Sequence, residues 1–247
     1  MDDYEFCACW ITDAHKAGGV RVLDYGCGDG KLVQLLRTRN ISAFGCDVFY
    51  EGGDYSETMD GNDFGNGIIK KMNDNKIPFD DSSFDIVVNT QVMEHVPDLD
   101  MVLAEIYRVL RHGGAVLSLF PDKGVWREGH CGIPFLHWFP KRTKLRVYYA
   151  AFLRGMGFGY FKKGKTVFQW SRDFCSWLDN WTYYRSRSAI EQSYKARFDS
   201  IQHIEDCWLR SRLGALSVFL LIVPKWCQVF VTRKWAGLVF VARKAVV

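Results

Sequence analysis

The sequence lacks the cysteine pairs that build most structural zinc sites. Its eight cysteines are scattered, no two stand at the C-x-x-C spacing, and only Cys7 and Cys9 lie close together. The first residues, Met1–Glu5, are acidic and do not resemble a secretory signal peptide. We therefore expect free thiols in a reducing compartment, and a cytoplasmic protein.

The sequence also lacks a strong excess of one charge, internal repeats, low-complexity tracts and a long apolar run. The most apolar stretch, Leu213–Val223, covers eleven residues, whereas a membrane span needs about 20. The 32 basic and 28 acidic residues leave a net charge of +4, which is too mild to indicate a nucleic-acid partner. With 48% apolar residues in 247, the chain can bury the core of one large domain or two small ones.

The chain is organised around the segment Val22–Lys31, which reads VLDYGCGDGK. The apolar residues before Asp24 are typical of a buried parallel strand, and the leucines after the segment follow helical spacing. Between them, Gly26, Gly28 and Gly30 predict a turn where the backbone approaches a ligand, beside the N–H groups of a helix N-terminus. An ordinary strand–helix turn without a ligand is the alternative.

The spacing of these glycines separates two kinds of ligand. Dinucleotide-binding turns read G-x-G-x-x-G and place a pyrophosphate on the helix. This turn reads G-x-G-x-G after an acid, which would repel a pyrophosphate and attract a cation. The segment therefore resembles motif I of the class I S-adenosylmethionine (SAM) dependent methyltransferases. The resemblance implies SAM as the cofactor, held by Asp24, Gly26, Cys27, Gly28 and Gly30.

A second predicted strand, Ile41–Asp47, also ends in an acid. A carboxylate at this place can accept hydrogen bonds from both hydroxyls of a ribose, as it does in dinucleotide enzymes. The resemblance implies this role for Asp47 with SAM, and Val48 would then flank the adenine ring. A solvated aspartate at a strand end is the alternative.

A short third strand, Ile68–Met72, is followed by Asn73, Asp74 and the tripeptide Ile77–Phe79. Many methyltransferases of this kind carry an acid four residues before a Leu-Pro-Phe, where it binds the adenine amino group. The matching position here is Asn73, and its neighbour is Asp74. The resemblance therefore leaves the adenine contact open between these two residues.

The fourth predicted strand, Phe84–Asn89, leads into the segment TQVMEHVPD. This stretch resembles the type 11 branch of the methyltransferases, which includes quinone-biosynthesis enzymes. Because ligands of open α/β sheets bind at carboxyl strand ends, the resemblance implies that Asn89, Thr90 and Gln91 line the methionine end of SAM. His95 is either a catalytic base or a structural histidine packed below the site, and we favour the structural role.

Leu99–Arg111 has the apolar spacing of a helix, with the pair Gly113–Gly114 at its end and a fifth strand over Ala115–Phe120. The phrase EIYRVLRHGG again resembles the type 11 family, so the resemblance extends over residues 20–121. It implies an α/β, Rossmann-like fold with a mostly parallel seven-stranded sheet.

The sequence changes character after residue 120, where eight of the nine tryptophans lie among basic residues. A helix over Gln169–Tyr184 would carry tryptophans on one face, and a further helix is expected over Ile190–Ile204. We expect residues 121–212 to form an inserted, aromatic-rich helical cap for substrate recognition. Aromatic rings stack on sugars and lipids, and basic side chains hold phosphates or carboxylates. The tryptophans could equally form the core of this cap.

His130 lies in a loop shortly after the fifth strand, which ends beside the methyl donor. We expect His130 to act as a general base on an acceptor hydroxyl, with Glu128 to orient it. His137 is expected to pack against Trp138. Glu128, His130 and His137 could form a metal site, but we expect no metal because nothing in their spacing supports that geometry.

The C-terminal part, residues 213–247, combines the apolar segment with a predicted last strand, Trp235–Arg243. Because Leu213–Val223 is apolar on nearly every face, it is either buried against the sheet or inserted in something apolar. We favour burial, and a peripheral contact of residues 213–234 with the inner face of a membrane is the alternative. The flanking basic residues that suit such a contact are Arg210, Arg212, Lys225, Arg233 and Lys234.

The sequence thus predicts one methyltransferase domain over residues 1–247, with its SAM-binding core in residues 1–120. We expect transfer of a methyl group from SAM to an oxygen atom of a glycan, a lipid-linked sugar or a related small metabolite. N-methylation and a quinone-type acceptor are the enzymatic alternatives. A SAM-binding interaction module without catalysis is the alternative from another class, and the oligomeric state is left open.

Overall fold

The computed structural model describes residues 1–14, 19–49, 66–73 and 76–246 of the chain. Strands and helices alternate through its first half, as the apolar spacing predicts. These elements are α1 (Asp3–Ala14), β1 (Arg21–Tyr25), α2 (Lys31–Thr38), β2 (Ser42–Asp47), β3 (Ile69–Lys71), β4 (Phe84–Thr90), α4 (Leu99–Val109) and β5 (Leu110–Phe120). The second half contains η2 (Leu136–Trp138), α5 (Lys144–Gly155), α6 (Val167–Trp181), α7 (Arg187–Lys195), β6 (Ser200–His203), α8 (Glu205–Leu213), η3 (Gly214–Ile222), α9 (Lys225–Trp235) and β7 (Leu238–Arg243).

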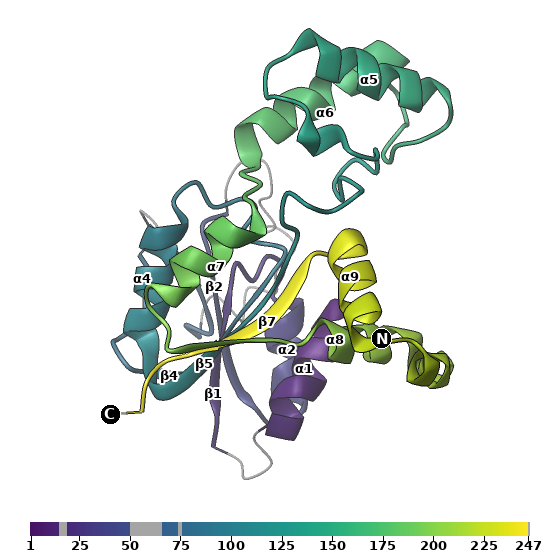
Figure 1. The fold of residues 1–247 in the computed structure, drawn as a ribbon. Coiled ribbons are helices and arrows are strands. Elements are labelled where there is room, and N and C mark those ends of the chain that lie inside the picture. Colours follow the sequence, from purple (N-terminus) through teal and green to yellow (C-terminus); the bar gives the residue numbers. More distant parts are fainter. Residues whose placement is uncertain (15–18, 50–65, 74–75, 247) are drawn as a thin grey trace.

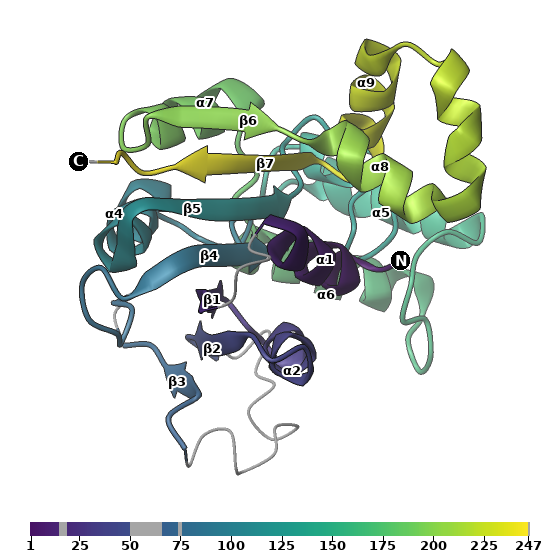
Figure 2. The same ribbon diagram turned by 90° about the horizontal axis from the view of Figure 1, so that it is seen from below.

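Seven strands form one sheet in the order β3-β2-β1-β4-β5-β7-β6. The pairs from β3 to β5 are parallel, while β7 runs antiparallel to both β5 and β6. Figure 2 shows β3 and β6 at opposite edges of this sheet. The strand order reverses between β1 and β4, so a crevice is expected at the carboxyl ends of these two strands. The Rossmann-like, mostly parallel sheet expected from the sequence is confirmed.

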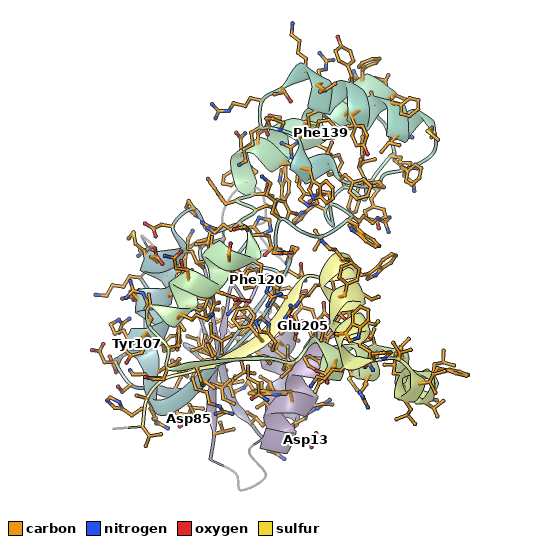
Figure 3. The ribbon with its side chains drawn as sticks, in the orientation of Figure 1. Asp13, Asp85, Tyr107, Phe120, Phe139 and Glu205 are labelled. Carbon is orange, nitrogen blue, oxygen red and sulfur yellow. The ribbon has the colours of Figure 1, made fainter. Side chains whose placement is uncertain are left out.

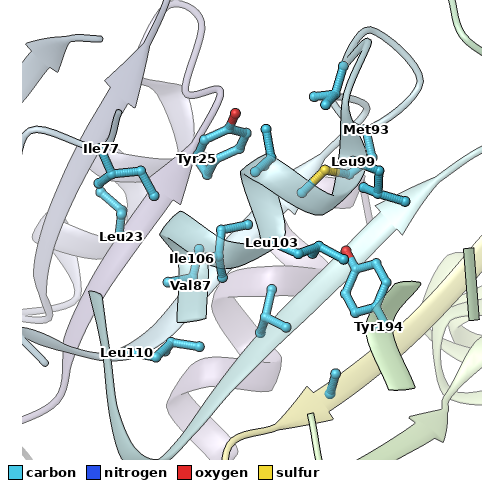
Figure 4. Close-up of a cluster of buried hydrophobic side chains, with 14 of the residues drawn as sticks. Leu23, Tyr25, Ile77, Val87, Met93, Leu99, Leu103, Ile106, Leu110 and Tyr194 are labelled. Atoms are coloured by element: carbon cyan, nitrogen blue, oxygen red, sulfur yellow. The ribbon is translucent and has the colours of Figure 1, made fainter. Parts of the chain in front are cut away.

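Helices cover both faces of the sheet, and each face has its own core. On one face, Leu103 of α4 shares a buried cluster with Val87 of β4 and Tyr194 of α7 (Figure 4). On the other face, α1, α2 and α8 enclose a second cluster that includes Val22 and Leu32 (Figure 1). Because neighbouring residues of a strand point to opposite faces, strands covered on both sides read as continuous apolar runs.

The end of α4 differs from the prediction. The helix stops at Val109, and Leu110 already pairs with Phe84 as the first residue of β5. The glycines expected to end the helix therefore lie inside the strand, where Gly113 has a φ of 73°. Apolar spacing cannot mark this boundary, because a buried leucine suits the last turn of a helix and the first residue of a central strand equally well.

A single helix over Ile190–Ile204 is also wrong. The helix α7 ends at Lys195, and Ser200–His203 form β6, the edge strand that pairs with β7. Every residue of β6 is at least partly exposed, so its sequence carries little apolar signal. Its strand conformation depends on a partner from the C-terminal part of the chain.

The helices α5 and α6 form a cap that stands apart from the sheet at the top of Figure 1. A third buried cluster joins them, with Trp170 and Leu178 of α6 near Ala150 of α5. The indole N–H of the fully buried Trp170 donates to the carbonyl oxygen of Tyr160 at 2.8 Å. The expected aromatic-rich cap is present, but α7, β6 and α8, which also fall in residues 121–212, return to the sheet.

The apolar segment near the C-terminus is exposed. η3 leaves α8 and projects away from the sheet, with side chains pointing outward around it (Figure 1, Figure 3). Within it Leu220 is buried, whereas Phe219 is 64% and Ile222 is 85% exposed. Burial of this segment against the sheet, which the sequence led us to favour, is therefore wrong. Within the described ranges, no helix is long and apolar enough to cross a membrane.

Candidate active site

A cavity of about 550 Å³ lies at the carboxyl ends of β1, β2 and β4. Its wall comes from the turn after β1, the end of β2, the segment after β4 and the cap helix α6. This is the crevice expected where the strand order reverses, and we call it the donor cavity. The predicted site residues that line it are Gly26, Gly28, Asp47, Val48, Thr90, Gln91, His95 and His130.

The turn after β1 brings bare backbone to the wall of the donor cavity. Gly26 has a φ of 76° and Gly28 a φ of 51°, in the left-handed region that side chains rarely adopt. A Cβ on Gly26 would lie only 2.5 Å from Cγ2 of Val92. Gly30 precedes α2 with a φ of 76° and is not among the described residues of the wall.

Asp47, at the end of β2, closes the turn from the opposite side. Its Oδ2 accepts a hydrogen bond of 2.9 Å from the N–H of Gly28, and its Oδ1 accepts one of 2.9 Å from the N–H of Phe49. A carboxylate has about four lone-pair sites, so this side chain can also accept bonds from hydroxyl groups in the cavity that it lines.

Asp24 is buried in β1, behind the turn. Burial raises the pKa of Asp24 to about 8, and the nearby charge of Asp47 adds to the shift. A cation in the donor cavity would favour the ionised carboxylate, because charges interact strongly where little water screens them. Asp24 is not among the described residues of the wall, so this effect would be electrostatic and not a direct contact.

Several other residues predicted to bind SAM are not among the described lining residues of the donor cavity. Cys27 is buried beneath the turn, and Asn89 is buried in the sheet, where it donates to Oγ of Ser118 at 3.0 Å. Asn73 is exposed and is not among the described residues of the wall. Asp74 lies outside the described residues.

Sequence reasoning misses part of the wall. Tyr25 and Met72 come from strand ends, and Trp177 and Trp181 come from α6. The two tryptophans belong to the aromatic face predicted over Gln169–Tyr184, so the sequence does contain a signal. The pattern cannot say what that face contacts, because this depends on how the cap folds back over the sheet.

His95, from the segment after β4, and His130, from the loop after β5, meet at the wall of the donor cavity. Their Nε2 atoms lie 3.1 Å apart, and the Trp177 ring packs against both imidazoles with centroids 5.9 Å and 5.0 Å away. Nδ1 of His95 donates to the carbonyl oxygen of Trp181 at 2.6 Å, because a carbonyl can only accept. Burial lowers the pKa of His95 to about 4, and the neighbouring His130 contributes to the shift.

Glu128 holds the His130 ring in place. Its Oε1 lies 2.6 Å from Nδ1 of His130 and accepts the hydroxyl of Tyr184 at 2.8 Å, while its Oε2 accepts the N–H of Cys131 at 2.7 Å. Burial would raise the pKa of Glu128, but these bonds outweigh it and lower the pKa to about 2. Burial lowers the pKa of His130, but the bond to ionised Glu128 outweighs it and the pKa is raised.

Glu94, which the sequence did not single out, is fully buried next to His95. Its Oε1 lies 4.0 Å from Nε2 of His95, and neither carboxylate oxygen has a hydrogen-bond partner among the described residues. Burial raises the pKa of Glu94 to about 7. His137 lies elsewhere and packs against Trp138, as predicted, and against Tyr184, with ring centroids 6.3 Å and 4.6 Å away.

A second cavity, of about 760 Å³, meets the donor cavity at Gln91 and His130, since these two residues line both. We call it the acceptor cavity. Its wall is largely apolar, and part of it comes from α8, the end of α9 and the residue that follows α9, while another part comes from the loop after β5. Its other lining residues include Val125, Arg127, Trp208, Leu209, Arg212, Leu213, Trp235 and Ala236.

The known proteins to which this chain is similar include several methyltransferases. Residues 23–118 match a family model described as a methyltransferase domain. The chain is 33% identical over 114 residues to the ubiquinone/menaquinone biosynthesis C-methyltransferase of Desulfotalea psychrophila, covering 44% of each. It is 31% identical over 149 residues to the phthiotriol/phenolphthiotriol dimycocerosates methyltransferase of Mycobacterium tuberculosis, covering 57% of this chain and 52% of that protein. A solved SAM-dependent methyltransferase from Mesorhizobium loti has the same fold, with a TM-score of 0.54 at 14% identity over 98% of this chain and 100% of that one.

Residues 23–118 of the chain form a methyltransferase domain of the class I SAM-dependent type. The chain spans about half the length of the curated relatives it matches. The matched family segment, residues 23–118, runs from β1 into β5 and so contains most of the donor cavity. It ends before the cap, α8 and α9.

The donor cavity of the methyltransferase fits SAM, the cofactor of this family. The backbone of Gly26 packs against Val92, where a Cβ would collide, so only glycine fits this part of the wall. The carboxylate of Asp47 suits the two ribose hydroxyls. The buried carboxylate of Asp24 suits a ligand that carries sulfonium and ammonium charges.

Proposed function

We propose that this methyltransferase transfers a methyl group from SAM to an oxygen atom of a glycan, a lipid-linked sugar or a related small metabolite. One observation carries this function: Gln91 and His130 line both cavities, so ligands in the two cavities would meet at these residues. Gly26, Gly28, Asp47 and the segment after β4 would hold the donor. The acceptor would enter from the opposite side, between the cap and α8.

When bound, SAM supplies a methyl group on a positively charged sulfur, which passes to the acceptor oxygen as the carbon–sulfur bond breaks. The residues of the chain would align the two ligands and exclude water. Alignment alone can supply about 7–11 kcal/mol of the rate enhancement. Trp177 and Trp181, which cover the donor cavity from the cap, are placed to exclude water.

An acceptor hydroxyl must also lose its proton, and His130 is the proposed base. Its Nδ1 is engaged by Glu128 at 2.6 Å, so its Nε2 is the atom that accepts the proton. His95 has its Nε2 3.1 Å from this atom and its Nδ1 bonded to the backbone of the cap. This placement suits a residue that positions His130.

The acceptor cavity favours a substrate with an apolar part. Trp208, Leu213 and Trp235 line it, and Arg127 adds a positive charge that suits a phosphate or carboxylate. One relative is named for phthiotriol dimycocerosates and another for ubiquinone and menaquinone. A quinone-type acceptor, methylated on carbon or oxygen, is therefore the second candidate.

Incubation with SAM that carries a labelled methyl group tests this function. Glycolipid, lipid-linked sugar and lipid-quinol extracts serve as acceptors, and mass spectrometry of the labelled product locates the methyl group. A new methyl ether is the expected result. A label on nitrogen or carbon would overturn O-methylation, and SAM binding without turnover on any extract would favour a SAM-binding module.

We further propose that residues 213–234 contact the surface of the membrane that carries the acceptor. Leu213 and Trp235 line the acceptor cavity, and Ile222 and Trp226, on the segment between them, have exposed apolar side chains. Three of the five flanking basic residues already pair with acids, since Arg212 binds Asp3, Lys225 binds Asp206 and Arg233 binds Glu205. Insertion of apolar side chains would therefore contribute more than attraction between charges.

A further inference from the structure

We propose that Glu94, His95 and His130 bind a divalent transition-metal ion that holds and activates the acceptor hydroxyl. The sequence led us to expect no metal, and the only metal set it left open, Glu128 with His130 and His137, is not the one assembled here. The inference rests on the proposed function of the same site. It replaces direct proton removal by His130 with activation of the hydroxyl by a bound cation.

The three side chains present their ligand atoms to a common point. One carboxylate oxygen and two imidazole nitrogens lie within 4.8 Å of one another, with the two Nε2 atoms 3.1 Å apart. Zinc–nitrogen and zinc–oxygen bonds of about 2.0–2.2 Å place neighbouring ligands about 3–3.5 Å apart. The histidine pair already has this spacing, and Oε1 of Glu94, 4.0 Å from His95, needs only a small shift.

The hydrogen bonds of the two rings direct both Nε2 lone pairs toward this point. Nδ1 of His95 donates to the carbonyl oxygen of Trp181, and Nδ1 of His130 donates to the carboxylate of Glu128. In a neutral imidazole the other nitrogen is then an acceptor, and two acceptors cannot hydrogen-bond to each other. A separation of 3.1 Å therefore requires a cation at this place, either a proton or a metal ion.

The environment of Glu94 favours the metal ion over the proton. Its side chain is completely buried, and both carboxylate oxygens lack a hydrogen-bond partner within the described part of the chain. A proton shared by the two histidines would lie too far from Oε1 of Glu94, which is 4.0 Å from Nε2 of His95, to give either carboxylate oxygen a hydrogen bond, and buried polar atoms without a partner are costly. A metal ion would compensate all three side chains at once.

The surroundings are also those of a metal site. Metal-binding histidines usually donate their other N–H to a carboxylate or a backbone carbonyl, which fixes the ring and its tautomer. Glu128 and the carbonyl of Trp181 supply one partner of each kind. Glu128 is itself held by Tyr184 and by the N–H of Cys131.

The ligand set indicates the metal and its task. Two imidazoles and one carboxylate suit Zn²⁺, Mn²⁺, Fe²⁺ or Co²⁺, whereas Mg²⁺ and Ca²⁺ prefer oxygen ligands throughout. Three protein ligands leave at least one position for an acceptor hydroxyl at the junction of the two cavities. Binding there lowers the pKa of the hydroxyl, and its proton leaves to water. The oxygen then forms a bond to the methyl carbon while the carbon–sulfur bond breaks. The electron pair of the broken bond stays on the sulfur, which becomes a neutral thioether.

Cobalt binding tests the site without any substrate. The full chain is treated with a chelator, dialysed and titrated with Co²⁺ while the visible absorption bands and the stoichiometry are recorded. One Co²⁺ per chain is expected. Glu94→Gln and His130→Gln should each weaken binding roughly 100-fold or more, and Glu128→Gln about 10- to 100-fold. The matched control is His203→Gln, because His203 also lies between carboxylates, those of Glu191 and Glu205, but is on the edge strand β6 and lines neither cavity.

SAM affinity, measured by calorimetry, shows that each variant retains the folded donor cavity. No Co²⁺ binding by the parent, or equal binding by the parent, Glu94→Gln and His130→Gln proteins, would overturn the metal site. If the chelated enzyme then still methylates its acceptor, the proposed function stands with His130 as the base. Activity that is lost with the chelator and returns with Zn²⁺, Mn²⁺ or Co²⁺ in the parent, but not in Glu94→Gln, is the result expected of the metal site.

Discussion

The backbone N–H of Gly28 donates a hydrogen bond of 2.9 Å to Oδ2 of Asp47, nineteen residues further along the chain. A single carboxylate therefore fixes the glycine turn after β1 and faces the donor cavity from the end of β2. The turn and the proposed ribose contact depend on the same side chain. A change at Asp47 should affect both.

Replacement of Asp47 by alanine is expected to weaken SAM binding about 10- to 100-fold. Lost hydrogen bonds to a charged group are worth roughly 1.5–3 kcal/mol, and each 1.4 kcal/mol corresponds to about tenfold in affinity. Isothermal titration calorimetry measures this effect. The control is Asp173→Ala, an exposed carboxylate on α6 that pairs with Lys165. Parental affinity in the Asp47→Ala protein would rule out the ribose contact.

Two glycines with the same backbone conformation should respond differently to alanine. Gly26 and Gly164 have φ values of 76° and 75°, but only at Gly26 would a Cβ collide with Val92, while Gly164 has open space. Gly164→Ala should lose only the cost of a left-handed alanine, about 1–2 kcal/mol of unfolding free energy. Gly26→Ala should lose more and should also bind SAM poorly. Thermal unfolding and calorimetry measure both effects, and equal behaviour of the two variants would contradict the close packing of the turn.

The affinity for SAM should rise with pH. Burial raises the pKa of Asp24 to about 8 in the ligand-free protein, so at lower pH this side chain is largely protonated. The positive charges of SAM favour the carboxylate, and binding should release a proton. The affinity should therefore increase by up to about tenfold per pH unit between about pH 6 and 8, and level off above that.

The raised pKa of Asp24 makes the stability of the fold change with pH in the opposite direction. Because the pKa of Asp24 is higher in the folded than in the unfolded chain, its contribution to stability is lost as the pH rises from about 4 to about 8. Asp24→Asn should remove this part of both pH dependences. An affinity for SAM that does not change with pH in the parent would contradict the electrostatic role of Asp24.

Charge on the exposed apolar segment should abolish membrane binding without unfolding the protein. Ile222 is 85% exposed, so Ile222→Glu should retain the parental melting temperature and lose co-sedimentation with anionic vesicles. Leu145→Glu, at an exposed leucine of α5 in the cap, is the matched control and should bind vesicles like the parent. Leu220 is the wrong position for this test, because it is the buried residue of η3. Vesicle binding by the Ile222→Glu protein, or none by the parent, would contradict the membrane contact.

Much of the sheet could be predicted from the sequence, because its central strands are covered on both faces. Val22–Tyr25 and Phe84–Asn89 read as apolar runs that end in polar residues, and such runs have few other interpretations. The edge strand β6 gave no such signal. Its alternation is between exposed and half-buried residues, and only pairing with β7 makes it a strand.

The donor side of the site was predictable for a related reason, since Gly26 and Gly28 follow directly after β1 and Asp47 is the last residue of β2. The histidine pair was not. The sequence indicates a role for His95 and for His130 separately, and their meeting depends on the path of the chain between β5 and the cap. Glu94 was missed because a glutamate in an apolar segment reads as solvated until its burial is known.

The position of β7 has a consequence for how the protein forms. β7 lies between β5 and β6, although it follows both in the sequence. During synthesis β6 leaves the ribosome without a partner and must wait for residues 238–243 before it can join the sheet. Pairings between distant segments form slowly, so the two strands beyond β5 should be the last to join the sheet. Until then the edge of β5 that pairs with β7 remains unpaired, and chaperones or other nascent chains can bind there.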